Sequence, residues 1–168
     1  MIPNTARNYL LSGIPGNISH DGPTRAISAV LDSPDETNNV FGRAFTYVTG
    51  QPSGPGTYER VQAGGEGVFA GIMINPKAYA IEVDYARNGT VGEFATMTVA
   101  FVQLGNDGNI GDAVSYDPDT GIISAGTAGT VIPGAHIARH EPSAETPRLA
   151  VIELNGLVTL TTPAAPGA

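Results

Sequence analysis

The feature that most constrains this chain is the spacing of its turn residues. The sequence holds 22 glycines and 13 prolines in 168 residues. From residue 26 onward, short apolar runs alternate with turn residues at intervals of about 10 to 15, which is typical of a β-sandwich or barrel. No stretch of a dozen residues combines helical apolar periodicity with capping residues. We therefore expect an all-β, jelly-roll-like sandwich or barrel.

The apolar runs themselves have the alternation of strands. Residues 40–48 place aromatic and small aliphatic side chains on opposite faces: Phe41, Phe45 and Tyr47 against Val40, Ala44 and Val48. Arg43 falls on the aromatic face. Further strands are expected at 26–31, 57–61, 67–74, 91–104, 113–116, 122–124, 135–138, 149–154 and 157–160, about nine or ten in total.

Turn residues identify individual hairpins. Asn155-Gly156 is the preferred pair for a two-residue type I′ turn, since both positions need positive φ, and it predicts a hairpin between 149–154 and 157–160. Residues 117–121, Asp-Pro-Asp-Thr-Gly, predict a second hairpin, in which proline presets the turn and Gly121 takes the left-handed position. Residues 33–36, Ser-Pro-Asp-Glu, can open a single turn of helix.

The first 25 residues differ from the rest of the chain. They contain scattered prolines and glycines and follow neither the helical nor the strand period. We interpret them as an extended arm, with a disordered terminus as the alternative. The arm carries more apolar side chains than a solvated tail normally has, so we expect it to lie on a surface: Ile2, Tyr9, Leu10, Leu11, Ile14 and Ile18.

Charge and composition exclude several functions. Sixteen acidic and 8 basic side chains give a formal net charge of −8, which rules out a nucleic-acid binder that depends on a basic surface. The chain has no cysteine, hence no disulfide framework and no thiolate site. No segment has the apolar length of a signal peptide or a membrane span, so we expect no membrane partner and synthesis in the cytoplasm.

No group of residues specifies a reaction, a cofactor or a metal. His136 and His140 are about 13 Å apart if their segment is a strand, too far to share one zinc ion, and we expect exposed histidines. Asp117, Asp119 and Gly121 resemble the start of a calcium loop, but Ile122 and Ala128 stand where an EF-hand needs glycine and glutamate. Without tryptophan, an aromatic sugar groove is also disfavoured. We expect no enzyme and no cofactor.

The cations are mostly arginines, seven against the single Lys77. Arginine suits fixed or interfacial pairs, because its planar guanidinium binds carboxylates with two parallel bonds and is weakly hydrated. Compositional bias is the alternative. A chain with little charge, few lysines and an apolar arm has the character of an assembly component.

Six short segments lie between residues 40 and 160: Phe41-Gly42-Arg43-Ala44, Val68-Phe69-Ala70-Gly71-Ile72, Asn75-Pro76-Lys77-Ala78-Tyr79, Gly111-Asp112-Ala113-Val114, Ile132-Pro133-Gly134-Ala135 and Ala150-Val151-Ile152-Glu153-Leu154-Asn155-Gly156. In these segments the chain resembles the decoration or structural cement proteins that coat the capsids of tailed bacteriophages. The arm lies outside this resemblance, and residues 90–104 are longer than the family pattern.

The resemblance implies a jelly-roll-like or barrel-like domain that oligomerises on the outer capsid surface and bridges neighbouring major capsid subunits. The expected partners are the major capsid protein and the chain itself, as a homodimer or else a trimer. The expected location is the virion. We expect the arm to contribute the capsid contacts: Arg7, Tyr9, Leu10, Leu11, Ile14 and Ile18.

The expected organisation is an arm over 1–25, one β-domain over 26–162 and a short flexible tail over 163–168. Two other functions stay open at this stage. A β-domain of a phage tail or baseplate shares every sequence feature used above. A jelly-roll module that binds a small molecule or a glycan, or a cupin-type metalloenzyme, needs clustered histidines, and the chain has three histidines in total.

Overall fold

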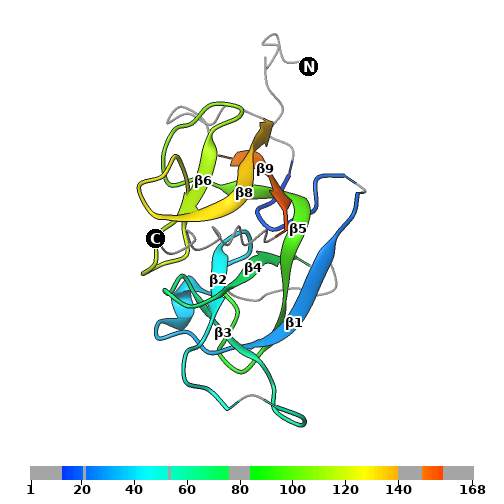
Figure 1. The fold of residues 1–168 in the computed structure, drawn as a ribbon, viewed down its shortest axis with the longest axis vertical. Coiled ribbons are helices and arrows are strands. Elements are labelled where there is room, and N and C mark those ends of the chain that lie inside the picture. Colours follow the sequence, from blue (N-terminus) through cyan, green and yellow to red (C-terminus); the bar gives the residue numbers. More distant parts are fainter. Residues whose placement is uncertain (1–12, 21, 53, 76–83, 140–148, 157–168) are drawn as a thin grey trace, which may run out of the picture.

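The computed structural model describes residues 13–20, 22–52, 54–75, 84–139 and 149–156, and strands dominate it (Figure 1). No α-helix occurs in these ranges, so the all-β prediction is confirmed. The elements are β1 (Arg25–Leu31), the 3-10 turn η1 (Glu36–Asn38), β2 (Ala44–Tyr47), β3 (Arg60–Ala63), β4 (Phe69–Ile74), β5 (Val91–Gln103), β6 (Ala113–Tyr116), β7 (Ile123–Ala125), β8 (Thr130–Arg139) and β9 (Leu149–Asn155). In the described part of the chain, no helix is long and apolar enough to cross a membrane.

Five strands close into a ring in the order β1-β3-β2-β4-β5, with β5 pairing back onto β1. We call this ring the first barrel; it occupies the lower part of Figure 1. Only β1 and β3 run parallel, and the other pairs are antiparallel. Its core contains Phe45 and Phe94, whose ring centroids lie 4.9 Å apart, together with Leu31 and Val61.

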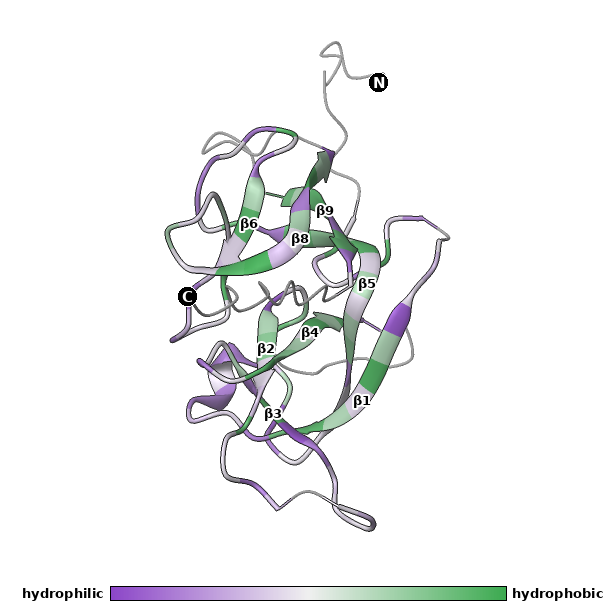
Figure 2. Ribbon diagram, in the orientation of Figure 1, coloured by the Kyte–Doolittle hydropathy of each residue, from purple (hydrophilic) through white to green (hydrophobic). Residues whose placement is uncertain are grey.

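The second half of β5 belongs to another ring, which we call the second barrel. Residues 97–103 of β5 pair with β9, and the order continues β9-β8-β6-β7. A bridge between Leu104 and Ile123 returns β7 to the end of β5, where the Gly105 N–H donates to the Ile123 carbonyl at 2.8 Å. The second core includes Val102, Val114, Ile137 and Ile152. Figure 2 shows hydrophobic segments on the strands of both barrels.

Strands β2 and β4 contribute to both cores. Ala44 and Ile72 face the second core, whereas Phe45 and Met73 face the first. The alternation predicted for residues 40–48 is therefore confirmed within β2, and it explains why both faces of this strand are apolar. The predicted boundary is wrong, because β2 begins at Ala44 and the preceding residues form a turn in which Gly42 has φ +81°.

The predicted turns are also present. Asp35 caps η1, since its Oδ1 accepts from the Thr37 amide at 3.0 Å and from the Thr37 hydroxyl at 2.7 Å. Between β6 and β7, the Asp117 carboxylate accepts from the Asp119 amide and the Thr120 hydroxyl, and Gly121 has φ +72°. Turn chemistry thus accounts for these acidic residues. The expected strand 157–160, and with it the second half of the Asn155-Gly156 hairpin, lies outside the described residues.

We expect Phe45→Ala to lower the free energy of unfolding by about 3–5 kcal/mol, because Phe45 is fully buried and its removal leaves a cavity against Phe94. Phe69→Ala is the matched control, since Phe69 is only partly buried on the edge of the second core. Urea unfolding of both variants measures the difference. An equal loss for both would contradict the described packing of the first core.

The cap of η1 makes stability depend on pH. Hydrogen bonds from Thr37 hold the pKa of Asp35 below its ordinary value of 3.8. A carboxyl group with a depressed folded pKa stabilises the native state above the unfolded pKa and loses this effect as pH falls through the folded pKa. The melting-temperature advantage of the natural protein over Asp35→Asn should therefore be largest near neutral pH and shrink below about pH 4. A constant difference from pH 7 to pH 3 would contradict this assignment.

Candidate functional site

The described part of the arm lies along β5. The Gly16 amide donates to the Phe101 carbonyl at 2.8 Å, the Phe101 amide donates to the Asn17 carbonyl at 2.9 Å, and the Ser19 amide donates to the Val99 carbonyl at 2.8 Å. Here the opposite edge of β5 is paired with β9. Residues 13–20 therefore add an antiparallel segment to the second half of β5. Backbone hydrogen bonds attach this part of the arm to the strand that both barrels share.

A second contact joins the arm to the first barrel. The Asn75 amide donates to the Gly16 carbonyl at 2.8 Å, just beyond the end of β4. Gly16 has φ +85°, and a Cβ built there would stand 2.6 Å from the Cβ of Phe41. Only glycine allows so close an approach with this backbone conformation. The arm is thus tied to both barrels at Gly16.

Two apolar side chains of the arm remain exposed, although the backbone of their segment is hydrogen-bonded to β5. Ile14 is 59% exposed and Ile18 is 36% exposed. The Arg139 guanidinium, at the end of β8, donates to the Ser19 hydroxyl and lies 3.3 Å from His20 Nδ1. Of the residues predicted to contact the capsid, Ile14 and Ile18 stand on the anchored segment, and Arg7, Tyr9, Leu10 and Leu11 lie outside the described residues.

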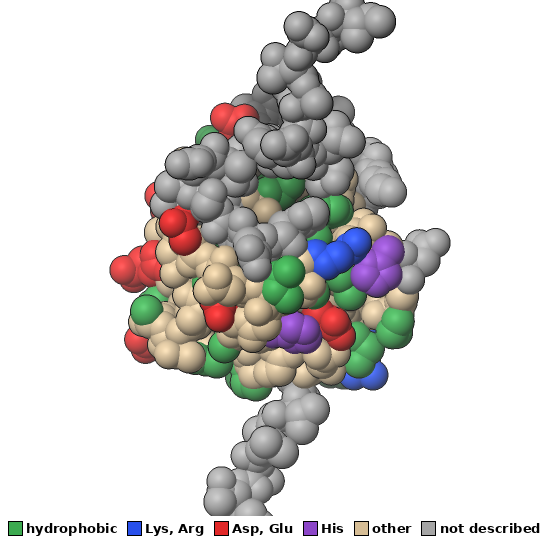
Figure 3. Space-filling model, turned by 90° about the horizontal axis from the view of Figure 1, so that it is seen from above, with side chains coloured by type: hydrophobic (Ala, Val, Ile, Leu, Met, Phe, Trp, Pro, Cys, Tyr) green, Lys and Arg blue, Asp and Glu red, His purple; other side chains and the backbone are tan. Residues whose placement is uncertain are grey.

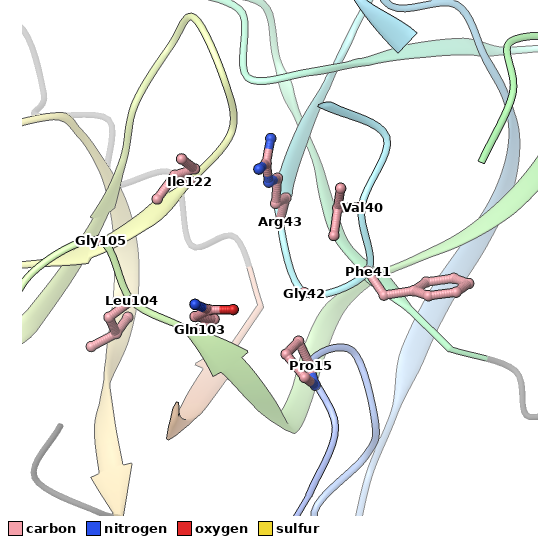
Figure 4. Close-up of a pocket in the computed structure, with 9 residues that line it drawn as sticks. All are labelled: Pro15, Val40, Phe41, Gly42, Arg43, Gln103, Leu104, Gly105 and Ile122. Carbon is pink, nitrogen blue, oxygen red and sulfur yellow. The ribbon is translucent and has the colours of Figure 1, made fainter. Parts of the chain in front are cut away.

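A pocket of about 320 Å³ opens where the arm and the two barrels meet (Figure 4). We call it the junction pocket. Its lining comes from Pro15 of the arm, residues 40–43 before β2, residues 103–105 at the end of β5, and Ile122 in the β6–β7 turn. The sequence did not reveal it, because these four segments are distant along the chain.

Arg43 is the charged residue of the junction pocket. Its Nη1 donates to the Asn38 Oδ1 at 2.6 Å and to the Thr120 carbonyl at 3.1 Å, so it joins η1 to the β6–β7 turn. Burial lowers the pKa of the guanidinium, and the charges of Asp117 and Asp35 oppose that shift. The strand alternation had placed Arg43 with the aromatic residues; the turn at 40–43 instead separates it from Phe41, whose ring points away (Figure 4).

The remaining described charges lie at the surface. Arg60 and Asp32 form an exposed pair at 3.2 Å, which contributes little to stability. His136 is on β8, as the strand expectation for its segment required, and its Nε2 lies 3.8 Å from Glu153 Oε2 on β9. Figure 3 shows histidine, acidic and basic side chains scattered over the face that is seen from above the view of Figure 1. His140 lies outside the described residues, within which no group of three potential metal ligands occurs.

Residues 2–155 match the family described as "Structural cement protein (E217 gp24/Pam3 gp6)". A solved structure titled "The capsid of Myoviridae Phage XM1" contains a chain with the same fold: the TM-score is 0.64 at 10% sequence identity, over 90% of this chain and 96% of that chain. No curated protein matches the sequence. Because the family match spans the arm, both barrels and the pocket between them, the chain belongs to the structural cement protein family of bacteriophages and is a structural protein of the virion capsid.

Proposed function

We propose that this protein binds the outer surface of a tailed-phage head, bridges neighbouring major capsid subunits and so stabilises the shell. The observation that carries the proposal is the arm: its backbone is hydrogen-bonded to β5, while Ile14 and Ile18 stay exposed. An apolar side chain on a fixed backbone loses little conformational entropy when a partner covers it. The proposed role is structural and requires no catalytic group.

Bridging needs a rigid body between two contacts. The two barrels share β5, and the arm is bonded to that strand and to the residue after β4. A force exerted on the arm by a bound capsid subunit would therefore be transmitted through these hydrogen bonds to β5, the strand that both barrels share. Many copies on one shell convert modest individual contacts into high avidity. The net charge of −8 also disfavours adhesion to packaged nucleic acid.

We expect the protein to act as a homodimer, with a trimer as the alternative. Each additional copy in the oligomer adds another arm, and with it another contact to the capsid lattice. Sedimentation velocity of the free protein separates these states. A monomer at working concentration, both free and on capsids, would contradict both.

The direct test of the proposal mixes purified protein with emptied, expanded heads. We expect saturable co-sedimentation and a higher melting temperature of the heads, because bound copies hold neighbouring subunits together. Heads that bind the protein without being stabilised would contradict bridging. A well-folded protein that does not bind heads would contradict the proposal and favour the tail or baseplate role, or the ligand-binding module.

Ile14→Ala combined with Ile18→Ala tests the arm contact. Burying an isoleucine side chain contributes about 1.5–3 kcal/mol, so we expect the double variant to bind heads at least ~10-fold more weakly. Its melting temperature without heads should change little, since both side chains are exposed. Ile110→Ala is the matched control: Ile110 is 56% exposed, close to the 59% of Ile14, but lies in the loop between β5 and β6. If the natural protein, the double variant and Ile110→Ala all bind heads equally well, Ile14 and Ile18 do not belong to the interface.

A further inference from the structure

The junction pocket combines several apolar side chains with one amide side chain and one cation. In Figure 4 the Arg43 guanidinium extends between Val40 and Ile122, and Pro15 and Gln103 lie across the opening. With a volume of about 320 Å³, the pocket can accept a side chain together with part of its backbone. Its size and its single charged group are typical of a site that recognises one polar group on an apolar ligand.

Arg43 uses only part of its hydrogen-bonding capacity. A guanidinium has five N–H donors, and both of the bonds described above are donated by Nη1 to neutral oxygens. Among the residues that the structure describes, Nη2 and Nε have no hydrogen-bond partner, and no carboxylate forms an ion pair with Arg43. The two unused nitrogens form the edge of a guanidinium that binds carboxylates with two parallel bonds.

The acidic residues nearest to Arg43 are already engaged. The Asp117 carboxylate accepts from Asp119 and Thr120 within its own turn. The Asp35 carboxylate accepts from both polar groups of Thr37. These charges act on Arg43 from a distance and do not contact it. Arg43 is only half-buried, so a carboxylate that reached it would replace water at the unused N–H groups and accept charge-assisted hydrogen bonds from them.

We propose that the junction pocket binds the carboxylate of an acidic residue that is flanked by an aliphatic side chain, on a protein segment of the capsid lattice. Arg43 binds the carboxylate, and Val40, Ile122 and Pro15 contact the aliphatic part. A protein segment is favoured because the pocket is continuous with the proposed interface: Pro15 lines it, and the exposed Ile14 is the preceding residue. This inference rests on the proposed function for the identity of the partner, but not for the chemistry of the pocket.

The chemistry is tested on the free protein with 3-methylbutanoate, a carboxylate on a branched aliphatic chain. We expect saturable shifts of the Gly42, Gly105 and Ile122 amide NMR signals in the millimolar range, and none with 3-methylbutan-1-ol, which lacks the charge. Arg43→Met should weaken binding at least ~10-fold, and Arg43→Lys less, because it keeps a positive charge. Arg60→Met, the same change at an exposed arginine, should bind like the natural protein.

A second variant leaves Arg43 and its two hydrogen bonds intact. Gln103 is exposed at the rim of the pocket, so Gln103→Trp should fill the opening and abolish 3-methylbutanoate binding without unfolding the protein. Val91→Trp, at the exposed start of β5, is its control. Binding of the alcohol as tightly as the carboxylate, or of inorganic phosphate more tightly, would overturn the proposal, as would carboxylate binding that survives both Arg43→Met and Gln103→Trp.

Head binding then separates the two proposals. If the pocket receives a segment of the lattice, Arg43→Met and Gln103→Trp should bind heads at least ~10-fold more weakly than Arg60→Met and Val91→Trp. Natural-strength head binding by the pocket variants overturns the assigned partner while the cement role stands. Failure of the natural protein itself to bind heads contradicts the proposed function, whereas the carboxylate titration still decides the chemistry of the pocket.

Discussion

The rest of the structure depends on the backbone pairing of β5, a strand of 13 residues that belongs to two barrels. Its first half pairs with β1 and β4, and its second half pairs with β9. Each half closes a different ring around a different core. Since one continuous strand links the rings, the barrels cannot move independently without breaking its hydrogen bonds. Such a shared strand suits the proposed role, in which the protein bridges two capsid subunits.

The same strand also organises the proposed interface. The second half of β5 has one edge covered by β9 and the other by residues 13–20. The arm thereby covers an edge that would otherwise be open to pairing with another chain. What it exposes instead are side chains, Ile14 and Ile18, whose contact with a partner depends on shape and apolar area. The junction pocket lies beside Ile14, because the next residue, Pro15, lines it, and it adds the charge of Arg43 to this surface.

Local sequence patterns predicted the elements well. The alternation in 40–48 assigned Ala44 and Phe45 to opposite faces, and they belong to different cores. Turn residues predicted the Asp117–Gly121 reversal and a single helical turn opened by residues 33–36, because side-chain hydrogen bonds and positive φ are determined within a few residues. The structure places the cap of that turn at Asp35. The start of β2 was missed by four residues. Gly42 adopts a left-handed conformation there that apolar alternation does not report.

The sequence by itself therefore determined the all-β class, most strands and turns, and the apolar character of residues 1–25, since each follows from composition, short-range periodicity and backbone preference. Only the tertiary structure decided that β5 serves two barrels, that the arm returns to β5, and that Arg43 points into a pocket. These features join residues far apart along the chain, such as Gly16 with Phe101 and Arg43 with Thr120. Their pairing depends on which strands meet when both cores close, and no local pattern encodes that.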